Sequence, residues 1–206
     1  MPPELDIRRH LETELASPDP WRLDANPFEQ RRFDAMMALI APSAPFGRGL
    51  EVGCAAGAFT ARLAPCCRRL DVIDVVPEAL ERAAARLPDA AHVTWEIADI
   101  AGDFDPTPRF DLIVVAEVLY YVDGPEALRR AVDTLGSALL PGGILVFGSA
   151  VDDACRRWGL FGGAETAMAE WDRRLRETAR LAITGADWGE NCLVVSYRRE
   201  PEASVT

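Results

Sequence analysis

The segment LEVGCAAGAFT at residues 50–60 carries glycines where a tight turn between a buried strand and a helix requires them. Gly53 and Gly57 bracket this turn, and glycine is used where backbone must pass close to a ligand, because a Cβ there would occupy the ligand's place. Asp74 ends a second hydrophobic strand, LDVID, where a carboxylate can accept hydrogen bonds from both hydroxyls of a ribose. The pattern predicts a nucleoside site. An ordinary strand–turn–helix of an α/β protein is the alternative interpretation.

The residues of the turn indicate which nucleoside it would hold. A dinucleotide site needs the spacing G-x-G-x-x-G, so that backbone amides can approach a pyrophosphate. Here Ala55 stands between Gly53 and Gly57, and Phe59 follows without the third glycine of that motif. Glu51 would repel a phosphate but would attract an ammonium or sulfonium group. The turn therefore favours S-adenosylmethionine over NAD as the cofactor.

The carboxyl ends of the next strands carry the other candidates for a cofactor site. In an open α/β sheet, ligands lie beyond these ends, at the point where the strand order reverses. Val75 follows Asp74 after the second strand, Asp99 and Ile100 follow the third, and Ala116 ends the fourth. We expect Asp99 to accept a hydrogen bond from the exocyclic amine of adenine, with Ile100 against the ring face. A turn cap is the alternative role of this aspartate.

A carboxylate and two tyrosines follow the fourth strand. Glu117 comes directly after the buried run DLIVVA, where a carboxylate is costly unless it has a partner. Tyr120 and Tyr121 each offer a face for an apolar or sugar ring and a hydroxyl group, although at least one of them is expected to serve packing. We interpret these three residues as the catalytic, acceptor-facing side of the site.

The elements that would position these residues alternate between strand and helix. Strands are predicted over residues 48–53, 69–74, 92–97, 110–116 and 143–149, and helices over 57–65, 77–87 and 125–139. The strands are short and rich in Val, Ile and Leu, as parallel strands covered on both faces are. Pro141-Gly142-Gly143 is expected to end a helix and to turn into the following strand. This order is typical of a Rossmann-like, doubly wound, mostly parallel α/β sheet.

The last quarter of the chain has a different pattern. A helix is predicted over residues 163–176, and strands over 178–184 and 191–198 flank a polar turn at 187–190. We expect these two strands to form a C-terminal antiparallel hairpin that closes the sheet.

The N-terminal part is predicted to form two helices, over residues 5–15 and 28–40, that lie over the cofactor site. At 206 residues the chain has the size of one domain. We expect a helical cap at 1–44, an α/β core at 45–200 and a disordered tail at 201–206.

The charge of the chain restricts its partners. The formal net charge is −11 and the isoelectric point is near 4.7. Nucleic acids and anionic membranes would be repelled by such a surface, so we expect neither as a partner. A cationic acceptor would be attracted, although the same charge also serves solubility.

The cysteines and histidines form no disulfide or metal pattern. Five cysteines are an odd number without a C-x-x-C pair, and the chain has only two histidines. The N-terminal sequence MPPELDIRRH lacks the apolar core of a signal peptide, and the longest apolar run is interrupted by Asp111 and Glu117. We therefore expect no metal site, reduced thiols and a cytoplasmic location.

Beyond these single patterns, the chain resembles a known family over almost its whole length. It is similar to the class I S-adenosylmethionine methyltransferases and, within them, to the nodulation protein S (NodS) family. The segments that carry the resemblance are DPWRLDANPFEQRR at 19–32, GLEVGCAAGAFTARLAP at 49–65, VIDVVPEAL at 72–80, FDLIVVAEVLYYV at 110–122, LLPGGILVFGSA at 139–150, and CRRWG with GAET at 155–166. Ala55 departs from the glycine that is commoner in the wider class.

The resemblance implies an activity and a set of contacts. It implies N-methylation of the free amine on the terminal glucosamine of a deacetylated chitooligosaccharide, a step in making rhizobial lipochitooligosaccharide signals. In the wider group, an arginine holds the carboxylate of the cofactor's methionine. It lies on the helix that follows the loop with the Pro-Trp pair, which is Pro20-Trp21 in this chain. The matching position is Arg32, with Trp21 over the same end and Arg31 as the alternative. Glu117 and Tyr121 would then orient the amine and accept its proton.

Other functions stay open at this point. One is methylation of another small amine or hydroxyl metabolite, because relatives that share the cofactor half can differ in their acceptor. A second is S-adenosylmethionine binding without catalysis, which Glu117 and the paired tyrosines disfavour. A third is an NAD-dependent oxidoreductase, which Glu51 and the missing third glycine disfavour.

Overall fold

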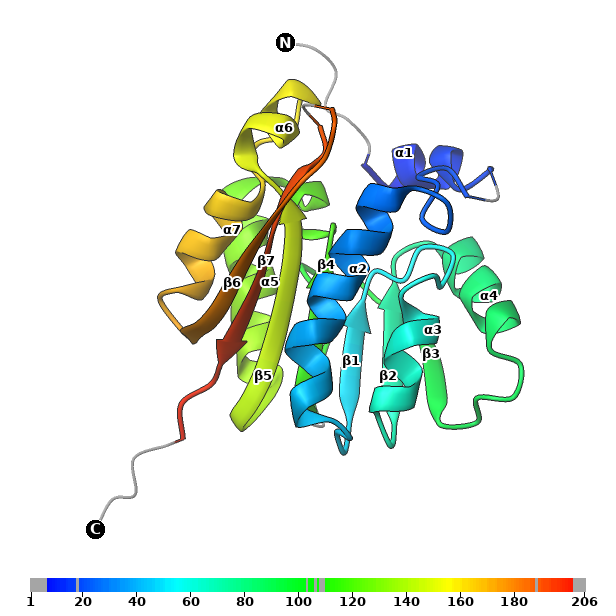
Figure 1. Cartoon of the computed structure of the whole chain (residues 1–206), viewed down its shortest axis with the longest axis vertical. Helices are drawn as coiled ribbons and strands as arrows, with labels where there is room; N and C mark the ends of the chain where they lie inside the picture. The colour runs from blue at the N-terminus through cyan, green and yellow to red at the C-terminus, as the bar shows by residue number, and fades with distance from the viewer. Residues whose placement is uncertain are drawn as a thin grey trace.

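The computed structural model describes residues 7–17, 19–102, 104–105, 107, 110–187 and 189–201. It contains a seven-stranded sheet in the order β3-β2-β1-β4-β5-β7-β6 (Figure 1). The strands are β1 (Gly49–Val52), β2 (Leu70–Asp74), β3 (Val93–Ile97), β4 (Phe110–Ala116), β5 (Leu139–Ala150), β6 (Arg176–Thr184) and β7 (Asn191–Arg198). The first five pair in parallel, whereas β7 runs antiparallel to β5 and β6. The predicted Rossmann-like sheet with a C-terminal antiparallel hairpin is confirmed.

The strand order reverses between β1 and β4. From β1 the chain continues to β2 and β3 on one side, and it then crosses back to β4 and β5 on the other. Val52 and Val115, near the carboxyl ends of β1 and β4, are paired across this point. The connections leave these two ends in opposite directions, so that a crevice forms between them. The fold therefore positions a ligand site beyond β1 and β4.

Helices cover both faces of the sheet. They are α1 (Ile7–Glu14), α2 (Pro27–Ile40), α3 (Thr60–Leu63), α4 (Pro77–Arg86), α5 (Gly124–Ala138), α6 (Asp152–Arg157) and α7 (Ala164–Trp171), with the 3₁₀ turns η1 (Ala41–Ser43), η2 (Ala64–Cys66) and η3 (Leu119–Tyr121). The helices α2, α3 and α4 pack on one face and α5 and α7 on the other (Figure 1). The start of α2 is set by Asn26, whose side chain accepts a hydrogen bond from the Phe28 amide, and by Pro27 in the first turn.

Each face of the sheet has its own hydrophobic core, because strand side chains alternate in direction. In β4, Leu112 and Val114 pack toward α2, α3 and α4, whereas Ile113 and Val115 pack toward α5 and α7. All four side chains are buried. Burial on both faces explains the continuous apolar runs of the sequence and fixes where the strand ends lie.

The helix predicted over residues 57–65 is wrong in length. The α-helix α3 begins only at Thr60, because the residues from Gly57 onward form the turn after β1, and it ends at Leu63. The 3₁₀ turn η2 then contains Pro65, which has no amide hydrogen to continue α-helical hydrogen bonding.

The helix predicted over residues 163–176 is also wrong in part, because it ends earlier than expected. Helix α7 ends at the fully buried Trp171, and β6 begins at Arg176, paired with Arg198 of β7. Strand pairing thus replaces the last predicted helical turn. The sequence pattern misses α6, whose first residue Asp152 accepts hydrogen bonds from the amides of Gly163 and Thr166 at the start of α7.

The predicted role of Pro141-Gly142-Gly143 as the end of a helix is wrong. Helix α5 already ends at Ala138, and β5 begins at Leu139, which is paired with Phe110. The three residues lie inside β5, where its register against β4 shifts. The Gly142 amide donates to the Arg199 carbonyl at 2.7 Å. The segment is therefore an irregularity within a long strand, in which glycine supplies a φ of +79°.

The structure also bears on the thiols, on membrane-spanning helices and on the ends of the chain. All five cysteines have free thiols. No helix within the described ranges is both long and apolar enough to cross a membrane. Residues 1–6, Trp188 of the predicted hairpin turn and residues 202–206 of the predicted tail lie outside the described residues.

The turn after β1 yields a prediction for stability. Gly57 and Gly124 have similar left-handed backbones, with φ of +79° and +76°, but only at Gly57 would a Cβ meet the protein, 2.7 Å from the Ala83 Cα in α4. We expect Gly57→Ala to lower the free energy of unfolding by about 2–5 kcal/mol, from backbone strain plus overpacking. The control Gly124→Ala should lose only about 1–2 kcal/mol. Urea unfolding followed by circular dichroism measures both, and equal losses would contradict the packing explanation.

Candidate functional site

A cavity of about 800 Å³ opens beyond the carboxyl ends of β1, β2 and β4. Segments from distant parts of the chain form its walls: α1 and α2, the loops after the first four strands, the end of β5 and the turn between β6 and β7. Ligand pockets typically measure about 300–1,000 Å³ and lie at such a switch point in α/β sheets. The cavity therefore has both the volume and the position in the fold that are typical of a ligand site.

The structure brings most of the predicted site residues together in the lining of this cavity. They are Trp21, Arg32, Glu51, Gly53, Ala55, Asp74, Val75, Asp99, Ile100, Ala116, Glu117, Tyr120 and Tyr121. Their shared location follows from the topology, which gathers the strand ends at one edge. Their individual roles stay predictions.

Gly57 lies outside the lining of the cavity, so its contact with a ligand stays a prediction. Its missing Cβ makes room for Ala83 of α4, not for a ligand. Gly53 does line the cavity, but a Cβ there would overlap the Val118 side chain. Both glycines are thus required by the left-handed turn and by neighbouring protein atoms. Ala55 adopts a left-handed φ of 47° in the same turn without being glycine.

Asp74 connects the end of β2 to the turn after β1 through hydrogen bonds. Its Oδ2 atom accepts hydrogen bonds from the amides of Cys54 at 3.0 Å and Ala55 at 3.3 Å, and its Oδ1 atom accepts one from Val76 at 3.0 Å. Burial raises the pKa of Asp74, and these amides oppose the rise. A carboxylate oxygen can accept two hydrogen bonds, so Oδ1 can also accept one from a ligand hydroxyl. The carboxylate is thus placed to do so without losing its backbone contacts.

Glu51 lines the cavity although only 3% of it is exposed. Its Oε2 atom has no hydrogen-bond partner among the described residues. Burial raises the pKa of Glu51 to about 8; the nearby Thr60 hydroxyl opposes this rise, and the charge of Asp74 adds to it. A cationic ligand beside Glu51 would supply the missing partner and would favour the charged form. This is the environment that the prediction of an ammonium or sulfonium neighbour requires.

The residues predicted to contact adenine lie at the edge of the sheet next to β2 and β3. Ile100 is 5% exposed and presents apolar surface to the cavity. The cofactor candidate Val75 is partly buried and also lines the cavity. The Oδ1 atom of Asp99 accepts a hydrogen bond from the Ala101 amide at 2.8 Å. Asp99 therefore acts as a turn cap, the alternative role considered for it, and its contact with adenine stays a prediction.

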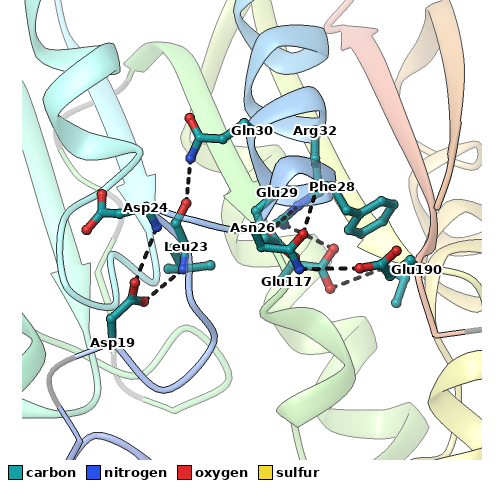
Figure 2. A network of polar contacts seen from close by, with 11 residues as sticks. Asp19, Leu23, Asp24, Asn26, Phe28, Glu29, Gln30, Arg32, Glu117 and Glu190 are labelled. Carbon is teal, nitrogen blue, oxygen red and sulfur yellow. Dashed lines mark hydrogen bonds and ion pairs between the residues drawn. The ribbon is translucent and has the colours of Figure 1, made fainter. Parts of the chain in front are cut away.

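A buried ion network contributes to the lining of the cavity (Figure 2). Arg32 is 3% exposed, donates from Nε to Glu29 at 3.0 Å, and pairs through Nη1 with Glu117 Oε1 at 3.0 Å. Burial opposes the charged form, but Glu117 and Glu29 together raise the pKa of Arg32 above its usual value. Burial raises the pKa of Glu29, which Arg32 counteracts. The guanidinium thus stays charged between two carboxylates.

The structure separates the two neighbouring arginines that the sequence leaves as alternatives. Arg32 points into the cavity, whereas Arg31 is exposed, lies over the Phe28 ring and donates to the Thr184 carbonyl at 3.2 Å. Only Arg32 of the two is placed to reach a bound molecule.

Glu117 is held in one position by several contacts. Its backbone has a φ of 55°, which is uncommon for a residue with a Cβ, and its amide donates to Gly148 at 2.8 Å. Its Oε2 atom accepts a hydrogen bond from the Ala150 amide at 3.2 Å, and Oε1 pairs with Arg32. The side chain remains 22% exposed, toward the cavity that it lines. The carboxylate therefore has the partners that burial demands and still faces a ligand.

The two predicted tyrosines stand beside Glu117. Their ring centroids are 4.5 Å apart in an edge arrangement, and Tyr120 is the more buried of the two. Burial, followed by the Glu117 charge, raises the pKa of Tyr121 to about 12 and that of Tyr120 well above its usual value. Both hydroxyls therefore keep their protons at neutral pH and can donate hydrogen bonds.

The lining residues that the sequence reasoning missed include Asn26, Glu29, Trp158 and Glu190. Glu29 could have been found, because it lies three residues before Arg32 and hence on the same side of a helix. Trp158 belongs to CRRWG, a segment of the family resemblance without an expected role. Asn26 donates to Glu190 at 3.4 Å (Figure 2). No local signal indicates this contact, because it joins loops 164 residues apart.

The comparison with protein families matches one family over nearly the whole chain. The model described as Nodulation protein S (NodS) matches residues 4–204. The chain belongs to the NodS family. Nodulation protein S from Sinorhizobium fredii is 51% identical over 189 residues, 92% of this chain and 87% of that protein. Nodulation protein S from Rhizobium tropici is 50% identical over 194 residues, 94% of this chain and 81% of that protein.

A solved NodS structure shows the same fold. It is the N-methyltransferase NodS from Bradyrhizobium japonicum in complex with S-adenosyl-L-homocysteine. Its TM-score to this chain is 0.92 at 47% identity, and the match covers 94% of this chain and 98% of that chain. The NodS family match spans all the elements that line the cavity, from α1 to β7.

The buried Glu51 predicts how stability depends on pH. Its pKa is about 8 in the folded chain against an ordinary 4.5, so between these pH values the folded state holds a proton that the unfolded state has released. The free energy of unfolding should therefore fall as pH rises through this window, by up to about 1.4 kcal/mol per pH unit. Glu51→Gln, which is neutral throughout, should remove this fall. Urea unfolding of both proteins at pH 6 and pH 8 measures it.

The control for this experiment is Glu81→Gln, which changes an exposed carboxylate on α4. Its stability should follow that of the unchanged chain at both pH values. Parallel curves for the unchanged chain and Glu51→Gln would show that Glu51 does not titrate in this window.

Proposed function

We propose that the chain transfers a methyl group from S-adenosylmethionine to the free amine on the terminal glucosamine of a deacetylated chitooligosaccharide, in the synthesis of rhizobial lipochitooligosaccharide signals. The observation that carries the proposal is one cavity in a NodS-family chain whose lining includes Glu51 and Asp74 together with the Glu117 carboxylate and two tyrosines. Membership in the NodS family and the likeness to an N-methyltransferase with bound S-adenosyl-L-homocysteine support it.

The chain is a class I methyltransferase, and its residues fit S-adenosylmethionine. Asp74 keeps an acceptor position on Oδ1 for a ribose hydroxyl. The unpartnered Oε2 of Glu51 suits the cationic methionine end. Val75 and Ile100 offer apolar surface for adenine. Arg32 offers its guanidinium to the methionine carboxylate, in addition to its two protein partners.

The mechanism needs positioning more than covalent chemistry. Bound S-adenosylmethionine supplies an activated methyl group, so the protein must align a nitrogen lone pair with it and exclude water, which is worth about 7–11 kcal/mol at best. A sugar amine should resemble an α-amino group, with a pKa of about 7.7–8, so a neutral fraction exists near pH 7. Glu117 accepts a hydrogen bond from this amine and then its proton, while Tyr121 orients it.

The neighbours of Glu117 explain why it can do this. Arg32 and the Ala150 amide hold its carboxylate in position, so that it can face a bound acceptor. The tyrosine hydroxyls keep their protons, so they donate to the acceptor without competing with Glu117 for its proton.

The decisive experiment uses purified protein with methyl-labelled S-adenosylmethionine and a panel of acceptors. The panel contains glucosamine oligomers, their N-acetylated forms and unrelated small amines. The chain contains no lysine, so methylation of its own lysine side chains cannot contribute label. We expect label only on deacetylated oligomers, because an amide lone pair is delocalised into the carbonyl. Equal labelling of acetylated and deacetylated oligomers would contradict the amine assignment.

The acceptor side yields a second prediction. Glu117→Gln should lower kcat on a glucosamine oligomer by about 10²-fold or more, because the proton acceptor is lost, and Tyr121→Phe should lower it less. Binding of S-adenosyl-L-homocysteine should stay within a few-fold in both. The control is Glu126→Gln on α5, where 84% of the side chain is exposed, and it should behave like the unchanged chain. Unchanged turnover in Glu117→Gln would remove this residue from the mechanism.

The cofactor side yields a third prediction, based on the different placement of the two arginines. Arg32→Met should weaken S-adenosyl-L-homocysteine binding about 10- to 100-fold more than binding of 5′-methylthioadenosine, which lacks the carboxylate, because a charge-assisted hydrogen bond is lost. Arg31→Met should affect neither ligand. Calorimetry measures all four combinations. Equal losses for both ligands in Arg32→Met would mean that Arg32 serves only Glu29 and Glu117.

A further inference from the structure

An exposed tryptophan stands at the mouth of the cavity without a role in the reaction described so far. Trp158 follows directly after α6, lines the cavity and is 46% exposed. Large hydrophobic side chains usually lie inside, and tryptophan brings both a broad apolar face and an N–H group. Such a residue in a pocket lining is suited to hold a ligand that is apolar on one face and polar at its edge.

The Trp158 ring is held in a defined orientation. Its amide donates to the carbonyls of Ala154 at 3.2 Å and Cys155 at 3.1 Å, which anchors the backbone to α6. Its ring meets the Tyr120 ring edge-on, with centroids 6.3 Å apart and planes at 64°. On another side it lies against the turn between β6 and β7, where a Cβ on Gly189 would be 3.4 Å from the Trp158 ring. A ring fixed in this way loses little freedom when a ligand covers it.

The side chains from Glu117 to Trp158 form a path from the interior to the surface. Tyr120 adjoins Glu117, whose charge acts on its hydroxyl, and is 7% exposed; Trp158 comes next and is 46% exposed. A molecule with its reactive group at Glu117 that extends outward past Tyr120 would therefore reach Trp158. A linear chain of sugars has this form, since each unit presents an apolar face of C–H groups and a polar rim.

Glu190 supplies the polar group that such a sugar would need beside the ring. It is adjacent to Gly189 in sequence, and both line the cavity. Its Oε2 atom accepts a hydrogen bond from the Ala186 amide at 3.0 Å, and its Oε1 atom accepts one from Asn26 at 3.4 Å. The carboxylate is thus fixed at the mouth and retains acceptor positions for a hydroxyl.

We propose that Trp158 determines acceptor length: its ring stacks on the sugar next to the one that carries the amine, and Glu190 accepts a hydrogen bond from a hydroxyl of that sugar. This inference rests on the proposed function, because it assumes a sugar amine at Glu117. It predicts that a single glucosamine uses only the inner part of the cavity, whereas a disaccharide gains the contact with Trp158.

Kinetics with acceptors of different length test the inference. We would measure kcat and KM for glucosamine, its deacetylated disaccharide and its tetrasaccharide with the unchanged chain, Trp158→Ala, Trp158→Phe and Leu181→Ala. Leu181 is an exposed apolar residue on β6 outside the cavity lining and serves as the control. S-adenosyl-L-homocysteine affinity, measured for each variant, reports whether the cofactor half stays intact.

We expect KM of the unchanged chain and of Leu181→Ala to fall from glucosamine to the disaccharide. Trp158→Ala should raise KM for the disaccharide and tetrasaccharide about tenfold and leave KM for glucosamine unchanged, so that the length preference disappears. Trp158→Phe, which keeps a ring face, should retain part of the preference. If the alanine variant no longer binds S-adenosyl-L-homocysteine, Trp158→Phe and Glu190→Gln take its place, each with a reduced length preference as the expected result.

Two results would overturn the inference while the proposed function stands. One is a wild-type length preference in Trp158→Ala, and the other is an equal rise of KM for glucosamine and its oligomers, which would indicate a structural role. Failure of the unchanged chain to methylate any amino sugar would instead overturn the proposed function, and the inference with it.

Discussion

The two halves of the cavity are joined by one buried cation, the Arg32 guanidinium. It comes from α2, near the start of the chain, and it lies between Glu29 of the same helix and Glu117 at the end of β4. Without a cation, two carboxylates in so buried a place would be strongly unfavourable. The helix is therefore bound to the strand end by charge as well as by its apolar side chains.

The other buried carboxylates are stabilised in different ways, and the difference divides the cavity. Asp74 is stabilised by backbone amides, which fix its orientation and preserve the turn after β1. Glu51 has no such donors for Oε2, so burial favours its protonated form. The side near Glu51 can thus respond to a cationic ligand. Glu117, in contrast, is held in position by Arg32 and the Ala150 amide. One cavity thereby combines an adaptable carboxylate with a fixed one.

The sequence predicts what depends on regular structure, because apolar runs mark buried strands and the topology then gathers their ends. This is why Asp74 and Glu117, far apart in the chain, were both expected at one site. It cannot show whether a missing Cβ faces a ligand or a helix, and Gly57 proved to face α4. Trp158 and Glu190 were missed because their placement depends on packing between α6 and the β6–β7 turn. The prediction that Pro141-Gly142-Gly143 ends a helix was wrong, because residues typical of turns also form irregularities inside strands.

The antiparallel course of β7 has a practical consequence for tethering. Cys192 lines the cavity, and Arg198 lies at the other end of the same strand, about 20 Å away at roughly 3.3 Å per residue. The described chain continues from there away from the cavity mouth (Figure 1). A surface linkage or a fused partner enzyme attached beyond Arg198 would therefore leave the mouth open to large acceptors. The same attachment at the β6–β7 turn would obstruct the mouth of the cavity. The far end of β7 is therefore the better attachment site for immobilising the protein or coupling it to another enzyme.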